Sequence, residues 1–393
     1  MIGFDEAIEL IGSAARPLGV ETVPLAQAAG RVLAAPVIAA IDSPRQNSSS
    51  MDGYAVREGD LAEQPARLTV IGESFAGAGW NGTVVPGTSA RIFTGAPLPG
   101  GADRVVMQEN VRREGDLAII EGDPGIARHI RKRGSDFAAG DQLLAKGRLL
   151  GPRALVAAAG ADISSIEVFR RPTLRIVSTG DELAEPGTAR ERADAVPDSL
   201  SLGVAALAEQ WGGSCLGRVG LRDDLPAMRA AATAACDGAD VIVVTGGASV
   251  GEKDYAKDMF PGLRLVFGKV AIKPGKPAWL GRVGDCLVVG LPGNPTSALV
   301  TARLFLAPLL ALLQGRQIED ALGWRSMPLA SALASSGDRE TFHRAALCGG
   351  TAELLSFQDS SAQKVLASAD LLVRQQAGSP ALAAGEQVQV LDF

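Results

Sequence analysis

Apolar and polar positions follow different patterns along the chain. From residue 5, apolar side chains recur at helical spacing until Gly19 and Pro24 interrupt them, so a short helix is predicted near the start. Between about residues 44 and 140, the apolar residues come in pairs and triplets separated by glycine turns, which is typical of short strands. We therefore predict an N-terminal region over residues 1–171, in which a helical and extended base carries an inserted β-rich domain.

A repeating order of strand, loop and helix begins after residue 171. The predicted strands are 174–177, 240–244 and 286–289, and the predicted helices are 199–211 and 224–235. Because these strands alternate with helical segments, they indicate a parallel sheet flanked by helices. The sequence thus predicts a central parallel α/β domain over residues 172–315.

Strand patterns return near the end of the chain. Residues 341–347 and 387–391 have the composition of strands, and they lie beyond Gly323. A C-terminal β-domain, barrel-like in form, is predicted over residues 320–393. The expected fold class is therefore multidomain α/β plus β.

Length and composition fit this division. A chain of 393 residues exceeds the size at which one hydrophobic core usually keeps growing, so several domains are expected. Apolar residues make up 47% of the chain and aromatic residues only 4%, which favours a globular protein and disfavours stacking on single-stranded bases. The net charge of -6 also opposes binding to nucleic acid, so any anionic ligand needs local positive groups.

Cysteine and histidine positions give little support for a zinc site or a disulfide framework. The four cysteines are far apart, and none forms a Cys-x-x-Cys pair or lies beside His129 or His343. The first residues lack the basic start and apolar core of a signal peptide. The most apolar stretch, 298–313, is interrupted by Arg303 and Pro308, so we interpret it as a buried helix. A cytoplasmic protein without a membrane partner is expected.

Three unusual loops follow predicted strands. Ligands of a parallel α/β sheet bind beyond the carboxyl ends of the strands, so these loops are the first candidates for a site. Their sequences are STGDE at residues 178–182, TGGASVG at 245–251 and GLPGNPTS at 290–297. The second loop can expose backbone amides to an oxyanion, and the third leads into a helix N-terminus that attracts anions. The candidate substrate-binding residues in these two loops are Gly246, Gly247, Ser249, Gly251, Pro292, Gly293 and Asn294.

Charged residues near these loops suggest an anion and a metal ion as ligands. Prolines fix the backbone around Lys273 and Lys276, whose ammonium groups can converge on one anion such as phosphate or molybdate; the alternative is a solvated basic turn. Glu182, Asp223 and Asp254 follow predicted strand ends and are candidate ligands for Mg²⁺, which is usually bound through one or two carboxylates plus substrate phosphate. Helix capping is the alternative, above all for Asp223, which precedes a predicted helix.

Six motifs, in order, closely resemble those of the MoeA-type molybdopterin molybdenumtransferases, a family that includes the E domain of gephyrin. They are MDGYA at residues 51–55, TGAPLP at 94–99, STGDEL at 178–183, the loop from Gly246 to Tyr255, KPGKP at 273–277 and LPGNP at 291–295. The resemblance extends more weakly through the C-terminal β-domain and so covers essentially the whole chain. It implies an elongated homodimer whose clefts use both subunits.

The resemblance also implies a reaction and a set of site residues. Adenylylated molybdopterin and molybdate are expected to react with Mg²⁺ to give molybdenum cofactor and AMP. The implied catalytic residues are Asp52, Thr94, Asp136, Glu182, Asp223 and Asp254, of which the last three are also the implied metal ligands. Molybdate is expected to bind to Lys273, Lys276, Arg344 and Ser360, with Arg339 as a helper. Protein partners compatible with this role are the adenylyltransferase and the molybdoenzyme apo-proteins.

The chain departs from the family in places, among them Ala248, which replaces a usual valine. Leu200 stands where relatives commonly have asparagine, and Asp359 stands where glycine is common, which places a carboxylate near the expected oxyanion site. Two other functions remain open. One is the adenylyltransferase that makes the activated substrate, which shares the Gly246 loop but normally lacks the β-rich region. The other is a non-catalytic molybdopterin scaffold or carrier, which would bind the cofactor without molybdate-dependent release of AMP.

Overall fold

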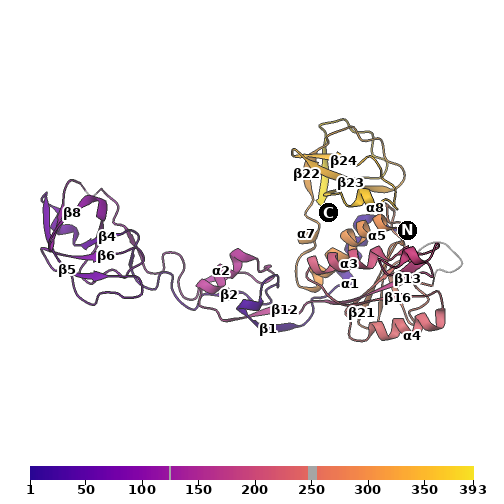
Figure 1. The fold of residues 1–393 in the computed structure, drawn as a ribbon, viewed down its shortest axis with the longest axis horizontal. Coiled ribbons are helices and arrows are strands. Elements are labelled where there is room, and N and C mark those ends of the chain that lie inside the picture. Colours follow the sequence, from indigo (N-terminus) through magenta and orange to yellow (C-terminus); the bar gives the residue numbers. More distant parts are fainter. Residues whose placement is uncertain (124, 247–254) are drawn as a thin grey trace.

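The protein is strongly elongated in its computed structural model, which describes residues 1–123, 125–246 and 255–393. A β-rich domain lies at one end, and the α/β layer lies with the C-terminal sheet at the other (Figure 1). Between them lies a small unit that contains two-stranded ladders and helix α2 (Pro152–Gly160). Both termini lie at the α/β end.

A six-stranded sheet forms the centre of the α/β layer. In spatial order its strands are β16 (Ser214–Leu221), β13 (Thr173–Thr179), β17 (Val241–Thr245), β21 (Cys286–Leu291), β20 (Trp279–Val283) and β18 (Arg264–Phe267). The first four strands are parallel to one another. Strand β20 pairs antiparallel with β21, and β18 pairs antiparallel with β20. The prediction of a parallel sheet is therefore wrong at this edge. The tight turn at Gly284 joins β20 directly to β21, and a turn of that length reverses the chain.

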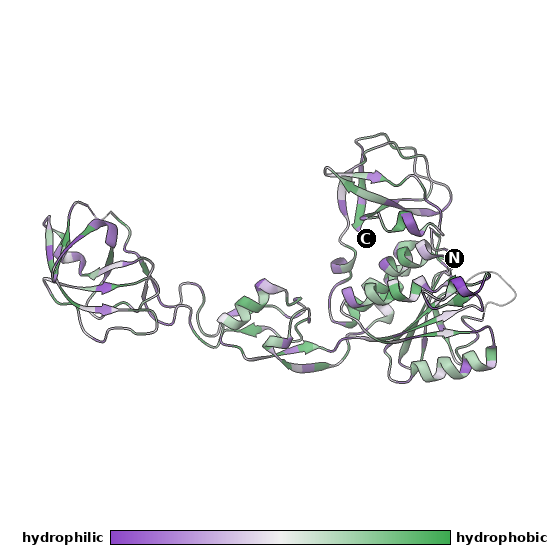
Figure 2. Ribbon diagram, viewed as in Figure 1, coloured by the Kyte–Doolittle hydropathy of each residue, from purple (hydrophilic) through white to green (hydrophobic). Residues whose placement is uncertain are grey.

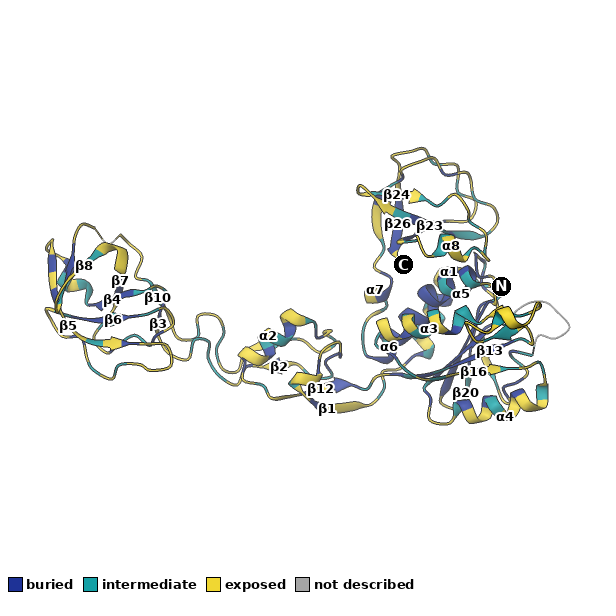
Figure 3. Ribbon diagram, in the orientation of Figure 1, coloured by how far each residue is buried: buried dark blue, intermediate teal, exposed yellow. Residues whose placement is uncertain are grey.

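Helices cover both faces of this sheet. Alternate side chains of β17, such as Val243 and Val244, enter different hydrophobic cores. Helix α3 (Ser199–Gln210) packs in the first core and α4 (Leu225–Cys236) in the second. All five residues of β17 are buried, which explains why this strand is a continuous apolar run in the sequence. Figure 3 shows exposed residues along the outer side of α4.

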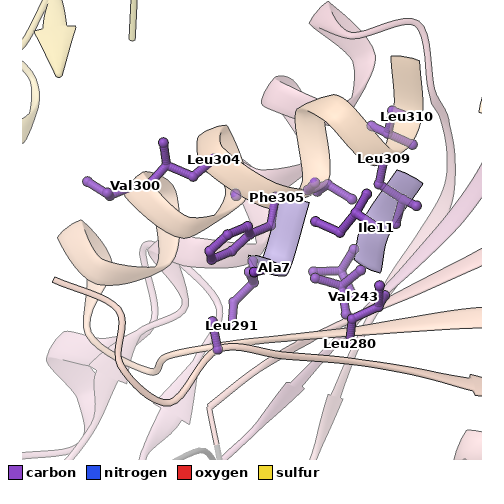
Figure 4. Packing of buried hydrophobic residues seen from close by; sticks show 14 of the residues in the cluster. Ala7, Ile11, Val243, Leu280, Leu291, Val300, Leu304, Phe305, Leu309 and Leu310 are labelled. Atoms are coloured by element: carbon purple, nitrogen blue, oxygen red, sulfur yellow. The ribbon is translucent and has the colours of Figure 1, made fainter. Parts of the chain in front are cut away.

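The most apolar stretch of the chain is a buried helix, as predicted. It consists of α5 (Pro295–Thr301), a π-helical turn η5 (Ala302–Leu306) and α6 (Ala307–Leu313). By length and composition it could cross a membrane, but 89% of its most apolar window is buried inside the protein. Figure 2 shows hydrophobic residues gathered along these inner helices, and Figure 4 shows how their side chains pack against the N-terminal helix and the sheet.

The N-terminal helix α1 (Phe4–Ala14) packs in this same core, and not with the region that follows it in sequence. The Phe4 ring lies 5.0 Å from that of Phe342 and 6.0 Å from that of Phe305, measured between ring centroids. The packing therefore differs from the predicted grouping of residues 1–171. An apolar helical stripe indicates that a helix needs a partner, but it does not specify which distant segment supplies it.

The C-terminal residues form a second six-stranded sheet. Its main path is β19 (Ile272–Lys273), β23 (Glu340–Cys348), β25 (Leu371–Gln375), β26 (Gln387–Asp392) and β22 (Arg325–Pro328), and β24 (Thr351–Leu354) pairs with β23. Strand β19 comes from the α/β segment, between β18 and β20, so this sheet takes one strand from outside the predicted C-terminal domain. Arg303 of the buried helix also donates hydrogen bonds to the carbonyls of Asp392 (2.7 Å) and Ala321 (2.8 Å).

A third six-stranded sheet forms the β-rich domain. Its order is β7 (Arg104–Met107), β4 (Gly53–Val56), β6 (Thr88–Ile92), β5 (Ala66–Ser74), β9 (Leu117–Ile120) and β8 (Val111–Glu114). Three short ladders connect it to the rest of the chain. They pair β3 (Ser48–Ser49) with β10 (Ile130–Arg131), β2 (Val37–Ile38) with β11 (Gln142–Leu144), and β1 (Val20–Pro24) with β12 (Ser165–Phe169). The chain thus runs out to this domain and back again, as an inserted domain does.

Replacing Phe305 by alanine is expected to destabilise the protein strongly. The ring is buried and lies within contact of Phe4 and Phe267, so its loss leaves a cavity that costs about 3–5 kcal/mol. Chemical denaturation measures the change in the free energy of unfolding. Phe357→Ala is the matched control, because that side chain is 57% exposed and its removal is expected to change the stability by no more than about 0.5 kcal/mol. Equal losses in both variants would contradict the assigned core.

Candidate active site

The carboxyl ends of β13, β17 and β21 open into a crevice, as expected for parallel strands of an α/β sheet. A cavity of about 330 Å³ lies there. Its lining includes Thr179, Glu182, Asp198, Thr245, Gly246, Gly293, Asn294 and Ser361. The structure therefore brings four of the predicted site residues together at one edge of the sheet. A fifth, Pro292, is buried directly before Gly293.

Two glycines allow the backbones of neighbouring loops to meet in this crevice. Gly246 has a φ of +92°, and a Cβ atom there would lie 2.5 Å from the carbonyl oxygen of Thr179. A Cβ atom on Gly293 would lie 3.5 Å from the Cα atom of Gly246. No side chain fits at position 246 without moving the end of β13, so this part of the crevice is walled by backbone.

A chain of hydrogen bonds joins residues in the wall of the crevice to Ser178 beside it. The hydroxyl of Thr245 donates to that of Ser178 (3.1 Å), which donates to the Asp198 carboxylate (2.9 Å). The other oxygen of Asp198 accepts from the backbone N–H of Ser201 (3.1 Å) and so caps α3. This network fixes the ends of two strands to a helix N-terminus. The sequence placed Ser178 and Thr245 in strand-exit loops, but it did not predict the hydrogen bonds that join them to Asp198.

Two of the three carboxylates predicted to bind Mg²⁺, Glu182 and Asp223, come from adjacent loops. A Cβ atom on Gly180 would lie 2.6 Å from the Glu182 carboxylate, so this group lies directly over the turn after β13. The backbone N–H of Asp223 donates to Asp181 (3.3 Å), which joins the two loops. Asp224, and not Asp223, caps α4 through the backbone N–H of Ala227. The capping alternative for Asp223 is therefore wrong. Among the described residues, no group of three or more His, Cys, Asp or Glu side chains is placed to hold a metal ion.

A second cavity, of about 470 Å³, lies between the buried helix and the C-terminal sheet. The charged side chains that line it are Lys273, Lys276, Arg339, Arg344 and Asp359. With four positive side chains and one negative side chain among the described residues, the wall of the cavity has a strongly positive net charge, although the chain as a whole has a net charge of -6. An oxyanion is the natural ligand of such a cavity.

The turn that carries the two lysines is fixed by its apolar residues. Pro274 and Gly275 are buried, whereas Lys273 and Lys276 are exposed. Gly275 has a φ of +111°, and a Cβ atom there would lie 2.2 Å from the Cγ2 atom of Thr301 in α5. The turn is closely packed on the helix, and both lysines line the cavity.

Arg344 and Ser360 form the wall that belongs to the C-terminal sheet. Arg344 is buried and donates to the carbonyl of Asp359 (3.1 Å); burial lowers the pKa of its guanidinium, and the nearby Asp359 carboxylate acts in the opposite direction. The hydroxyl of Ser360 accepts a hydrogen bond from the side-chain amide of Asn294 (3.0 Å). Since Asn294 lines the crevice and Ser360 lines the cationic cavity, this bond joins the two cavities. Arg339 lies beside them and donates weakly to the carbonyl of Ile272 (3.4 Å).

His343 is a lining residue that the sequence did not single out. Its Nε2 atom lies 2.9 Å from the side-chain oxygen of Gln375. Desolvation by burial lowers the pKa of the imidazole, the nearby charges of Arg344 and Lys273 lower it further, and the Gln375 contact raises it. The strand position of His343, next to Arg344, was the only available signal.

Asp52, Thr94 and Asp136 lie away from these cavities in the same chain (Figure 1). Asp52 accepts hydrogen bonds from the backbone N–H (2.7 Å) and the hydroxyl (2.8 Å) of Thr94. These bonds, together with the charge of Arg91, hold the pKa of the Asp52 carboxyl below its ordinary value against a smaller effect of burial. Asp136 is exposed near the base of the β-rich domain, where its backbone N–H donates to Ser43 (3.0 Å).

Four predicted site residues lie outside the described part of the chain. They are Gly247, Ser249, Gly251 and Asp254. Their roles stay predictions from the sequence.

These features define a class of protein, namely a ligand-binding α/β domain whose strand ends adjoin a cationic cavity shared with a C-terminal β-sheet. Residues 2–161 match the MoeA N-terminal region (domain I and II), residues 175–312 match a probable molybdopterin binding domain, and residues 326–393 match the MoeA C-terminal region (domain IV). The chain belongs to the MoeA family of molybdopterin molybdenumtransferases, which are enzymes of molybdenum cofactor biosynthesis.

Individual relatives agree with this assignment. The chain is 34% identical over 393 residues to molybdopterin molybdenumtransferase 2 of Mycobacterium tuberculosis, covering 97% of this chain and 96% of the relative. It is 37% identical over 321 residues to the molybdopterin molybdenumtransferase of Haemophilus influenzae, covering 81% and 78%. The crystal structure of the molybdopterin biosynthesis moeA protein from Pyrococcus horikoshii OT3 has a TM-score of 0.86 to this fold at 26% identity, covering 100% of both chains. The resemblance found in the sequence is confirmed.

The neutral state of His343 is expected to make stability depend on pH. Because its pKa is lower in the folded protein than in the unfolded chain, the unfolded chain binds the proton first as the pH falls. The stability contributed by the neutral ring is therefore complete above about pH 6.5 and is lost as the pH falls below that value. Denaturation curves from about pH 8 to about pH 5 should show a steeper loss for the wild type than for His343→Gln. Identical pH slopes would contradict this prediction.

Proposed function

We propose that the protein inserts molybdate into adenylylated molybdopterin and releases AMP. The observation that carries this proposal is the cationic cavity, which adjoins the sheet-edge crevice through the bond between Asn294 and Ser360. A cavity with four positive side chains suits a small oxyanion, and a crevice walled by glycine backbone suits a phosphate-bearing ligand. The two reactants can therefore occupy adjacent compartments.

The cationic cavity is the proposed site of molybdate. Lys273 and Lys276 supply mobile point charges from the turn on α5, while Arg344 supplies a fixed guanidinium from β23. Ser360 can donate its hydroxyl proton to an oxyanion while it still accepts from Asn294. The carboxylate of Asp359 is turned toward Ser361, whose backbone N–H (2.8 Å) and hydroxyl both donate to it. These bonds reduce the repulsion between Asp359 and a bound anion.

The crevice is the proposed site of the activated molybdopterin. Gly246, Gly293 and Asn294 surround the position where its phosphates fit, and Glu182 and Asp223 lie on the loops beside it. Two carboxylates and a substrate phosphate are the donor set that Mg²⁺ prefers, so the described residues fit this ion even without Asp254. When bound, Mg²⁺ neutralises charge on the phosphates and on the incoming oxyanion.

Positioning carries the proposed mechanism, and no protein nucleophile is required. The chain holds an electrophilic phosphoanhydride beside a metal oxyanion, and the lysines and Arg344 reduce the repulsion between the two anions. Glu182 and Asp223 orient the phosphate end and a water molecule; the water oxygen forms a bond to one phosphorus of the anhydride, the bond from that phosphorus to the bridging oxygen breaks, and AMP leaves. The hydrogen-bonded chain from Thr245 to Asp198 keeps the strand ends in place during this exchange.

A homodimer would complete the site. Asp52 precedes β4, Thr94 follows β6 and Asp136 follows β10, and the β-rich domain of β4 and β6 lies at the opposite end of the elongated molecule from the crevice (Figure 1). A second copy can bring its β-rich domain to this crevice, and we assign these three residues to the neighbouring subunit. The enzyme is expected to act in the cytoplasm, where it receives substrate from the adenylyltransferase and passes its product to molybdoenzyme apo-proteins.

Lys276→Ala should weaken the binding of molybdate selectively. Loss of one charge-assisted contact costs about 1.5–3 kcal/mol, or roughly one to two decades in affinity, so excess molybdate should largely restore the rate. Release of AMP across a molybdate titration measures this effect. Lys269→Ala is the matched control, because it removes the same charge from an exposed position outside the cavity. An unchanged molybdate dependence in Lys276→Ala would remove this lysine from the site.

Glu182→Gln should instead raise the Mg²⁺ concentration required for half-maximal rate. The substitution keeps the size of the side chain and removes its charge, and more oxyanion cannot replace a ligand of the metal. The measurement is AMP release across a Mg²⁺ titration at saturating molybdate. Glu185→Gln, an exposed neighbour outside the crevice lining, serves as control. Rescue of Glu182→Gln by molybdate would reverse the assignment, and full wild-type activity after exhaustive chelation would exclude the metal.

A further inference from the structure

Two phenylalanine rings, an exposed one and a half-buried one, form a stack at the end of the β-rich sheet. Strand β6 pairs with β4 so that Tyr54 lies opposite Arg91, and with β5 so that Ser74 lies opposite Ile92. Beyond these pairs, the backbone N–H of Phe93 donates to Ser74 (3.2 Å), which leaves Phe75 beside Phe93. Their rings are stacked, with centroids 4.6 Å apart and planes inclined by 13°.

Arg91 continues this stack along β6. Its guanidinium carbon lies 4.7 Å from the ring centroid of Phe93 and 5.1 Å from that of Tyr54. The same side chain donates hydrogen bonds to the carbonyl of Gly53 (2.9 Å) and to Gln108 (2.6 Å), so its position is fixed. Phe93 is therefore supported by a cation and by a second ring.

The outer ring is held in place although it is exposed. Phe75 is 42% exposed, yet its backbone N–H and carbonyl both bond to Ala78 at 3.1 Å in a tight turn. A cross-strand aromatic pair contributes to sheet stability in proportion to the area that it buries. That contribution does not require Phe75 to present a large apolar face to solvent.

The stack adjoins two of the three residues of this region that were assigned to catalysis. Thr94 directly follows Phe93, and its backbone N–H and hydroxyl both donate to Asp52. In the antiparallel register of β4 and β6, Asp52 is the position opposite Phe93. The stacked rings, the guanidinium and the carboxylate thus share one end of one sheet.

We propose that Phe75 and Phe93 form a stacking platform for a flat nitrogen heterocycle of the molybdopterin substrate, and that this platform positions the substrate beside Asp52 and Thr94. The proposal rests on the proposed function, since it supplies the platform to the crevice of a second subunit. A fused heterocycle matches the area of a ring face and gains from stacking irrespective of its hydrogen-bonding edge. The adjacent Arg91 favours an anionic ligand, which the phosphate of the substrate provides.

The pterin and the adenine of the activated substrate are both flat nitrogen heterocycles. Measurements of direct binding distinguish which of the two stacks on the platform. Molybdopterin, prepared without oxygen, and AMP are titrated separately against the full-length wild type, Phe75→Ala and Phe75→Trp. Phe75→Ala should weaken the binding of one of the two ligands about ten-fold, which corresponds to ~1.4 kcal/mol. Phe75→Trp should retain the affinity, because a larger ring face stacks at least as well. Val85→Ala, which removes an exposed apolar side chain elsewhere in the same domain, should change neither affinity.

Steady-state kinetics supplies the second test. In Phe75→Ala the KM for adenylylated molybdopterin should rise about ten-fold while the KM for molybdate stays unchanged. Unchanged affinities for both ligands and an unchanged KM would overturn the platform. The platform would also be overturned if sedimentation shows that the Phe75→Ala dimer dissociates and the kinetic defect disappears at protein concentrations that restore the dimer. Phe75 would then be a contact between subunits. If the wild type releases no AMP in the presence of molybdate, the proposed function is contradicted. Even then, weaker binding of AMP or of molybdopterin to Phe75→Ala than to the wild type would support the platform.

Discussion

The arrangement of the α/β end depends on the burial of one apolar helix, Pro295–Leu313, on nearly all sides. A helix of this composition cannot be left in water, so it must be covered by several elements at once. The sheet covers one side, α1 covers another, and the C-terminal sheet is joined through Arg303, which bonds to the carbonyl of Asp392. The helix begins at the crevice, and the turn with Lys273 and Lys276 packs against its Thr301. The position of the buried helix therefore also determines where both cavities lie.

Local patterns predicted three strands of the central sheet, β13, β17 and β21, and the helices α3 and α4, but they did not predict β16, β18 or β20. The run 240–244 was read as a buried strand and is β17 (Val241–Thr245), since only a strand covered on both faces is apolar at every position. The helix predicted over 199–211 is α3 (Ser199–Gln210). The direction of β20 and the placement of α1 were not predictable in this way. Both depend on contacts between distant segments, and an apolar stripe or run does not name its partner.

The candidate site shows the same division. The strand-exit loops and the lysine turn were found because glycine, proline and charge at strand ends carry a local signal. His343 and the chain from Thr245 through Ser178 to Asp198 were missed, because a polar residue in a strand acquires its role only from the element packed against it. The adjacency of Asp52 and Thr94 joins residues 42 positions apart through the pairing of two strands, which sequence spacing alone does not fix.

The short strand β19 and the lysine turn after it contact both the C-terminal sheet and the buried helix. Ile272 and Lys273 pair with Glu340 and Thr341 of the C-terminal sheet, while Gly275, two residues later, packs against Thr301 of the helix. The two walls of the cationic cavity therefore cannot separate without breaking either a strand ladder or a close-packed contact. The backbone around the cavity is therefore held in place at this turn, and if an anion binds there, the fixed dimensions of the cavity would contribute more to selectivity than closure around the ligand.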